Sequence, residues 1–398
     1  MALTVAAGAI VDEPPGPLLF GIRVEFFLFA LTLLGVALFH DRTLDVGFIG
    51  LASIVLLKYL TVTDFRLARH AWEEAPILVN LLGLLLGFAV LARHFEQSDI
   101  PEILPRFLPD DWKGGFTLLA MVFVLSAFLD NIAAAMIGGT VALHVFHRRI
   151  HVGYLAAIVG ASNAGGSGSV LGDTTTTMMW IEGVSAVDVL RAYVAAIPAF
   201  LFFAVVASRQ QHAHHPIQSQ PVGAHRIIWA RVVAVILILA GAIATNILLD
   251  FPAAGVWIAI AISAFFVRTD WKVVPASMKG TLFLLTLVTC ASLMPVETLP
   301  VASWQTAFGL GWVSAVFDNI PLTKLALEQD GYDWGMVAFA VGFGGSMIWF
   351  GSSAGVALAN MVPEARSVVN WIRHGWHLGV GYTLGFAVLL LVHGWHPG

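Results

Sequence analysis

Two copies of one short signature carry most of the polar chemistry of this sequence. Residues 126–132 read Ser-Ala-Phe-Leu-Asp-Asn-Ile, and residues 314–320 read Ser-Ala-Val-Phe-Asp-Asn-Ile, nearly half the chain later. A string rich in glycine and serine follows each copy, at 165–173 and at 344–352. Each half therefore holds an Asp-Asn pair and then a glycine-serine string, in the same order. A duplicated polar site inside apolar sequence is typical of a transporter built from two related halves.

The residue types at these positions suit a small cation and a proton. A carboxylate at bilayer depth costs about 2.5–3.5 kcal/mol on insertion scales, so it usually faces a polar pathway. Hard cations prefer oxygen ligands, which carboxylates, amides and hydroxyls supply. The predicted ion-binding and proton-coupling residues are Asp130, Asn131, Ser162, Asn163, Asp173 and Thr174 in the first half, and Asp318, Asn319, Ser346, Ser352 and Ser353 in the second. Among them, Asp130, Asn131, Asp173 and Asp318 are the predicted Na⁺ ligands.

The two halves differ at chemically important positions. Ser352 aligns with Asp173, so one half carries two acids and the other carries one. Lys324 stands where the first half has Met136. Two interpretations of Lys324 remain open, a counter-ion for Asp318 and a side chain that snorkels out of the outer arm.

A purely structural interpretation of the acids competes with the functional one. Asp130 is placed to cap a helix over 131–146, and Asp318 to cap an arm that begins near Pro321. The two interpretations are compatible, because a half-helix end inside the membrane is itself a device for holding an ion. The recurrence of the pair in both halves favours function.

The composition places the chain in a membrane. Of its residues 58% are hydrophobic and 11% are charged, and the mean hydropathy is +0.85, whereas a soluble domain has roughly 25% charged residues. The net charge of −5 comes without a basic patch, so nucleic acid is not an expected partner. The single Cys290 excludes disulfides within the chain and cysteine-bound metals. The first residues lack a basic start, so we expect no cleavable signal peptide.

The hydropathy pattern separates plain spans from interrupted ones. Regions 115–146 and 305–328 read as re-entrant hairpins around the Asp-Asn pairs, and regions 154–182 and 334–362 as broken helices. The region 95–112 is amphipathic and interrupted by proline, which predicts an interfacial helix. Plain apolar segments lie at about 24–40, 46–62, 76–93, 188–207, 230–248, 253–268, 280–295 and 376–395.

Lysine and arginine set the expected orientation. Basic residues gather in the loops 94–113 and 208–229, which we assign to the cytoplasm, whereas 182–187, 249–252 and 296–304 have none. The fold class predicted is an all-α polytopic membrane protein of two inverted repeats, each with five crossings, a re-entrant hairpin and a broken helix. Its expected parts are an N-terminal segment 1–23, a first repeat 24–207, a polar cytoplasmic linker 208–229 and a second repeat 230–398. The linker histidines, His212, His214, His215 and His225, favour a solvated connector over a metal or pH sensor.

The motif strings resemble those of a known family. In the first half the strings are Asp-Asn-Ile at 130–132, Ser-Asn-Ala-Gly-Gly and Gly-Asp-Thr-Thr-Thr. In the second half they are Asp-Asn-Ile-Pro-Leu, Gly-Gly-Ser and Gly-Ser-Ser-Ala-Gly-Val-Ala. They look like the motifs of the D-type bacterial sodium/proton antiporters. These belong to the ion-transporter superfamily, with arsenite permeases and citrate or dicarboxylate carriers. The resemblance covers about 24–395 and implies inverted repeats, re-entrant hairpins, broken helices and a homodimer. The dicarboxylate carriers have Ser-Asn-Thr at each hairpin tip, and aspartate in its place here favours a cation as substrate.

The resulting prediction is a secondary transporter in the bacterial inner membrane that exchanges Na⁺ or Li⁺ for H⁺. We expect no enzyme activity and no cofactor beyond the transported ions, with lipid and small inorganic ions as partners. One alternative is a Na⁺- or H⁺-coupled carrier of citrate, another dicarboxylate or arsenite. A remote alternative is an intramembrane serine protease, since Gly-Ser-Ser-Ala-Gly at 351–355 matches a nucleophile-elbow pattern but lacks the strand setting and positioned histidine.

Overall fold

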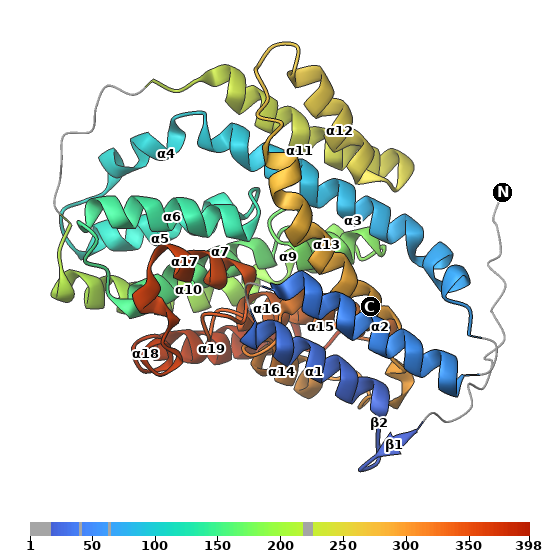
Figure 1. Ribbon diagram of the computed structural model, residues 1–398. Helices are drawn as coiled ribbons and strands as arrows, with labels where there is room; N and C mark the ends of the chain where they lie inside the picture. The colour runs from blue at the N-terminus through green and yellow to red at the C-terminus, as the bar shows by residue number, and fades with distance from the viewer. Residues whose placement is uncertain (1–16, 40–41, 63–64, 218–225) are drawn as a thin grey trace.

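The computed structural model describes the chain except for residues 1–16, 40–41, 63–64 and 218–225, and it is helical almost throughout (Figure 1). Two short strands, β1 (Leu18–Leu19) and β2 (Ile22–Arg23), form a hairpin before the first helix. His225 of the expected linker lies outside the described residues.

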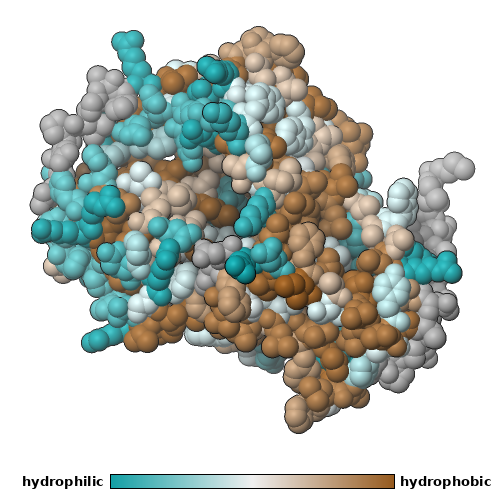
Figure 2. All heavy atoms as spheres, viewed as in Figure 1, coloured by the Kyte–Doolittle hydropathy of each residue, from teal (hydrophilic) through white to brown (hydrophobic). Residues whose placement is uncertain are grey.

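Among the described residues, six helical segments are long and apolar enough to cross a membrane. They are Thr43–Thr61, Leu67–Glu96, Ala186–His214, Trp229–Leu249, Val273–Ser292 and Trp376–His393. Large apolar side chains such as Ile49, Ile247 and Leu391 are exposed on these helices. Apolar atoms cover much of the molecule in Figure 2, while hydrophilic atoms gather at its left edge, near α4 and the ends of α5 and α6. The chain is thus an α-helical multi-pass membrane protein.

The first three helices of each half form one group, which we call the frame. They are α1 (Val24–Leu38), α2 (Thr43–Thr61), α3 (Leu67–Glu96), α11 (Trp229–Leu249), α12 (Pro252–Ser263) and α13 (Val273–Ser292). Helix α1 packs on α2, α11 packs on α12, and α3 and α13 join the two sets by packing on each other.

The remaining long helices form a second group, which we call the core group. In the first half they are α5 (Trp112–Ser126), α6 (Asn131–Val145), α7 (Val152–Ser167), α8 (Thr174–Ile181) and α10 (Tyr193–His214). In the second half they are α14 (Trp304–Ser314), α15 (Asn319–Gln329), α16 (Trp334–Gly344), α17 (Ser353–Met361) and α19 (Trp376–His393). The same packing occurs within each half, since α5 packs on α7 and, correspondingly, α14 packs on α16. Helix α10 packs on α19 and joins the two halves.

The predicted interruptions are confirmed. Helices α5 and α6 meet at a turn before Asn131, and α14 and α15 meet at a turn before Asn319. The regions 154–182 and 334–362 each split into two helices, α7 with α8 and α16 with α17. The second hairpin arm begins at Asn319 rather than near Pro321, because Asp318 caps it directly.

Two expected elements differ from the structure. Between the end of α3 at Glu96 and the start of α5 at Trp112, the chain forms only a single turn α4 (Ile100–Ile103) and a 3₁₀ turn Leu104–Phe107, because Pro105 lacks the backbone N–H that a continuing helix needs. The region 253–268 is helical only as far as Ser263. Short helices α9 (Ala186–Leu190) and α18 (Val368–His374) precede α10 and α19.

Glycines allow the interrupted helices to touch their hairpins backbone to backbone. A Cβ atom at Gly165 of α7 would collide with the carbonyl of Phe123 in α5, and one at Gly344 of α16 with the carbonyl of Gly311 in α14. Gly165 and Gly344 are matching positions of the two repeated strings. Both halves thus need a residue without a side chain at the same contact.

We predict that Gly165→Ala lowers stability, because the added methyl group forces α7 away from α5 at a typical overpacking cost of about 1–3 kcal/mol. Gly309→Ala is the matched control, since no atom lies within 4 Å of a Cβ built there. Thermal unfolding of the purified protein in detergent measures the difference. Equal melting temperatures for the two variants would contradict the close contact.

Candidate functional site

One asparagine joins the two halves at the centre of the core group. The Asn163 side chain in α7 donates through its amide nitrogen to the hydroxyls of Ser346, at 3.0 Å, and Ser352, at 3.1 Å. Its amide oxygen accepts from the Asn131 side chain at 3.1 Å. All four residues are buried, and they come from both hairpin-and-broken-helix units. The two predicted half-sites therefore form a single polar cluster.

The three predicted acids all cap half-helices. Asp130 accepts from the Ile132 backbone N–H at 3.2 Å, Asp318 from the Ile320 N–H at 3.0 Å, and Asp173 from an N–H in the first turn of α8. The helix N-terminus carries partial positive charge, which helps to hold a carboxylate in apolar surroundings. The capping interpretation is thus correct, and it places negative charge at three helix ends.

Asp173 is capped through one oxygen only. Its Oδ1 atom accepts from Thr175 N–H, whereas its buried Oδ2 atom has no hydrogen-bond partner. The carboxylate lies close enough to Asp130 and Asp318 to interact electrostatically with both. An unpaired buried carboxylate oxygen is costly, so a proton or a cation at this atom would relieve that cost.

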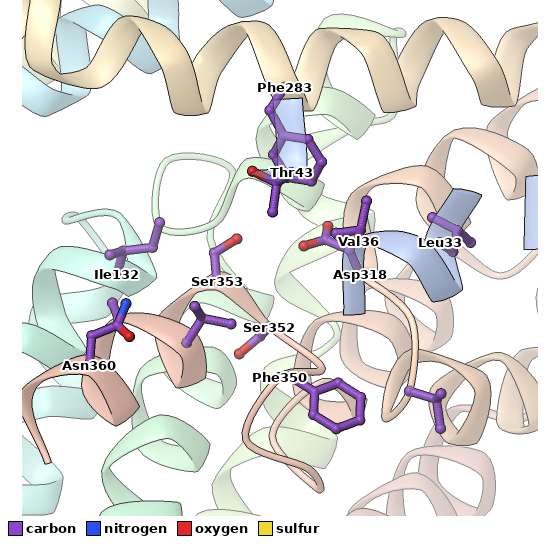
Figure 3. A pocket seen from close by; sticks show the side chains of 13 residues that line it. Leu33, Val36, Thr43, Ile132, Phe283, Asp318, Phe350, Ser352, Ser353 and Asn360 are labelled. Atoms are coloured by element: carbon purple, nitrogen blue, oxygen red, sulfur yellow. The ribbon is translucent and has the colours of Figure 1, made fainter. Parts of the chain in front are cut away.

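A cavity of about 280 Å³ reaches Asp318 from one side of the molecule. Figure 3 shows the Asp318 carboxylate and the Ser353 hydroxyl turned toward the same space. The cavity shares Val356 and Asn360 with a second recess of about 400 Å³, which Arg42 and Arg366 also line. The site is thus approached from the face of the molecule that carries these two arginines.

The other predicted residues differ in how closely they join the cluster. Asn319 is buried beside Asp318, and Thr174 is buried in the first turn of α8. Ser162 is buried as well, but its hydroxyl donates to the Val159 carbonyl of its own helix. The described structure therefore gives Ser162 no polar contact with the cluster.

The structure contradicts the interpretation of Lys324 as a counter-ion for Asp318. Its ammonium group instead pairs with Glu74, Glu182 and Glu328. Asp318 caps the start of α15, and Lys324 lies six residues further, about 9 Å along the helix axis at 1.5 Å per residue. Snorkelling to solvent is also wrong, because the side chain is only 2% exposed.

Two aromatic residues that the sequence analysis missed satisfy carbonyls at the helix breaks. Tyr193 donates to the Gly165 carbonyl at 2.9 Å, and Trp371 donates to the Ser346 carbonyl at 3.1 Å. Both carbonyls lie near the end of a broken helix, where the next intrahelical donor is missing. No local motif marks these residues, since each lies outside the repeated strings.

Comparison with known proteins adds an independent finding. The chain is 28% identical over 322 residues to the Na(+)/H(+) antiporter NhaD of Vibrio parahaemolyticus, covering 66% of this chain and 75% of that protein. It is 26% identical to the NhaD antiporter of Alkalimonas amylolytica, covering 87% and 90% of the two chains. It is also 26% identical to sodium/proton antiporter 1 of Arabidopsis thaliana, covering 88% and 68%. No family model matches the chain. The similarity to NhaD-type proteins extends over most of the sequence.

We predict that Asn163→Ala destabilises the protein by about 1–3 kcal/mol, because it leaves buried polar groups on both halves without their partner. Ser162→Ala, the neighbouring control, removes only a bond within one helix and should cost about 1 kcal/mol or less. Thermal unfolding in detergent tests the pair. A larger loss for Ser162→Ala would exclude Asn163 as the link between the halves.

Proposed function

We propose that the protein is a sodium/proton antiporter that exchanges Na⁺ or Li⁺ for H⁺ by alternating access. The observation that carries this proposal is the meeting of Asp130, Asp173 and Asp318 around one buried polar cluster. In the part of the chain that the structure describes, no lysine or arginine pairs with these three acids. Uncompensated carboxylates in a membrane interior suit a cation that binds and leaves. The similarity to sodium/proton antiporters supports the same function.

The proposed mechanism is competition of Na⁺ and H⁺ for the same carboxylates, chiefly Asp173 together with Asp130. Asn131, Asn163, Ser346 and Ser352 would complete the oxygen ligands, with Thr174, Asn319 and Ser353 near them. Ser162, which is bonded within its own helix, is left out of this set. Asp318, which faces the cavity, would admit the cation from the cytoplasmic side. Binding of Na⁺ then requires loss of the proton, and protonation releases Na⁺.

The architecture we propose has two inverted repeats, 24–207 and 230–398, joined by the linker 208–229. The bias of basic residues supports it, because an odd number of crossings in each half turns the second half over. Each half would have five crossings, and the two hairpins would enter from opposite faces. The homodimer, the bacterial inner membrane and the absence of a cofactor stay predictions drawn from the family resemblance and from the composition.

The alternatives have less support. A carrier of citrate or another dicarboxylate needs a cation beside its substrate, and the ammonium group of Lys324 is paired with glutamates instead. A serine protease needs a histidine next to its nucleophile. Among described residues, the Ser352 hydroxyl has Asn163 and the Gly355 N–H as its hydrogen-bond partners.

Transport by the purified protein in liposomes tests the proposal. With a pH-sensitive dye inside, addition of Na⁺ or Li⁺ should drive proton movement, whereas K⁺ and citrate should not. Lowering the pH should raise the apparent Michaelis constant for Na⁺ by up to about tenfold per pH unit for each competing proton, at a nearly constant maximal rate. A current driven by citrate or arsenite, with no proton movement on Na⁺ addition, would establish the anion carrier instead.

Asp130→Asn, Asp173→Asn and Asp318→Asn should each reduce Na⁺-driven proton movement at least tenfold. The amide keeps the shape and size of the side chain but removes the charge that both ions need. Ser352→Ala should have a milder effect, since a neutral ligand contributes less than a charged one. Normal transport in all three Asn variants would remove the carboxylates from the mechanism.

The inverted arrangement predicts which face each hairpin base occupies. A cysteine at exposed Arg149, beside the first hairpin, should react with a membrane-impermeant thiol reagent only from the cytoplasmic side. A cysteine at Val301, 84% exposed before the second hairpin, should react only from the outside. The native Cys290 is buried and serves as the unreactive background. Labelling of both positions from the same side is incompatible with inversion.

A further inference from the structure

A buried ion-pair cluster lies apart from the carboxylate site and has no part in the proposed ion binding. The Lys324 ammonium is 2.6 Å from Glu182, 2.7 Å from Glu328 and 3.2 Å from Glu74. Lys324 is 2% exposed, and the three carboxylates are 14–30% exposed. Burial of a lysine at this level is stable only when it is well paired, so the cluster is held together as a unit.

The three carboxylates belong to different parts of the fold. Glu328 lies on α15 with Lys324, and Glu182 directly follows α8 as its C-cap residue. Both of these half-helices begin at the site, since Asp318 caps α15 and Asp173 caps α8. Glu74, in contrast, lies on α3 of the frame. Lys324 therefore ties the far ends of two site helices to each other and also to a frame helix.

Two related pairs of helices lead away from the site, and we call the path along each pair a route. The Lys324 cluster lies along one of these routes. Helix α8 packs on α15 in one route, and α17 packs on α6 in the other. The cavity follows the second route, along α17 from Ser352 to Asn360. The positions that correspond to Lys324, Glu328 and Glu182 on that open route are Met136, Thr140 and Met361. Charged side chains thus occupy one route, whereas the related route has no ionisable side chain at the corresponding positions.

Burial follows the same division. Ile132 and Ala357 line the cavity on the open route. Their counterparts on the charged route are Ile320, which is 3% exposed, and Met178, which is fully buried. The charge pattern places the charged route at the outer face, because its helices end at the loops 182–187 and 329–333, which contain no lysine or arginine.

We propose that Lys324 is a positioning residue that closes the outer gate of the transporter. Its pairs with Glu182 and Glu328 hold α8 and α15 together, and its pair with Glu74 holds them against α3 while the cytoplasmic cavity is open. Opening to the outside breaks the Lys324–Glu74 pair and leaves the other two intact. The inference rests on the alternating-access part of the proposed function, but not on which ion is carried.

The test compares two glutamates of the same cluster. Glu74→Gln removes the pair between frame and core group, whereas the control Glu328→Gln removes a pair within α15. The reporter is Met178→Cys, labelled from the outside with an impermeant thiol reagent in membrane vesicles. Because labelling of a buried cysteine follows the population of the open state, Glu74→Gln should raise its rate at least tenfold. Glu328→Gln should change the rate less than threefold.

A second, milder variant keeps the test valid if Glu74→Gln fails to fold. Glu74→Asp keeps the charge but shortens the reach to Lys324, so it should raise labelling by an intermediate factor. Equal labelling of Met178→Cys in the parent, Glu74→Gln and Glu74→Asp backgrounds would overturn the gate, as would an equal rise with Glu328→Gln. Labelling needs no transported ion. If the protein exchanges Na⁺ for H⁺ but Glu74→Gln does not change the labelling, only the proposed gate is refuted. If the labelling changes but Na⁺ moves no protons, only the proposed ion exchange is refuted.

Discussion

The structure depends on how backbone groups are satisfied where helices break inside apolar protein. A bilayer offers no water to unpaired N–H and C=O groups, so irregular backbone survives only with partners supplied by the protein. Here Asp130, Asp173, Asp318 and Ser352 accept from the first N–H groups of the half-helices. At the opposite ends, Tyr193 and Trp371 donate to freed carbonyls. The packing of the core group follows from the need to bury these breaks against one another.

In the proposed function, capping and ion binding are two uses of the same side chains. A carboxylate has two oxygens, and a cap occupies only one of them. The partial positive charge of the helix end stabilises the ionised form, while the crowding of three acids favours a bound proton or cation. Asp173 shows this difference between its two oxygens, because Oδ1 accepts a hydrogen bond from the Thr175 N–H and Oδ2 has no hydrogen-bond partner. A break that is required by the fold thus leaves a carboxylate oxygen free of the cap, which the proposed ion binding uses.

Much of the site could be predicted from the sequence, because its signals are local. The Asp-Asn pairs and glycine strings interrupt apolar runs, and such interruptions fix where helices end. The contacts between halves could not be predicted in this way. Asn163 meets Ser346 and Ser352 only because α7 and α16 pack together. The partners of Lys324 could not be predicted for the same reason, since Glu74 and Glu182 are distant in sequence and carry no motif.

The cluster around Lys324 also has an electrical consequence. The part of it that lies on α8 and α15, one lysine and two glutamates, has a formal charge of −1. Moving one elementary charge across the whole membrane potential is worth about 2.3 kcal/mol per 100 mV. If α8 and α15 shift along the membrane normal, the protein itself displaces charge, whatever ion occupies the site. The voltage dependence of such a transporter then belongs partly to its own side chains, and it persists in a cycle whose ions carry no net charge.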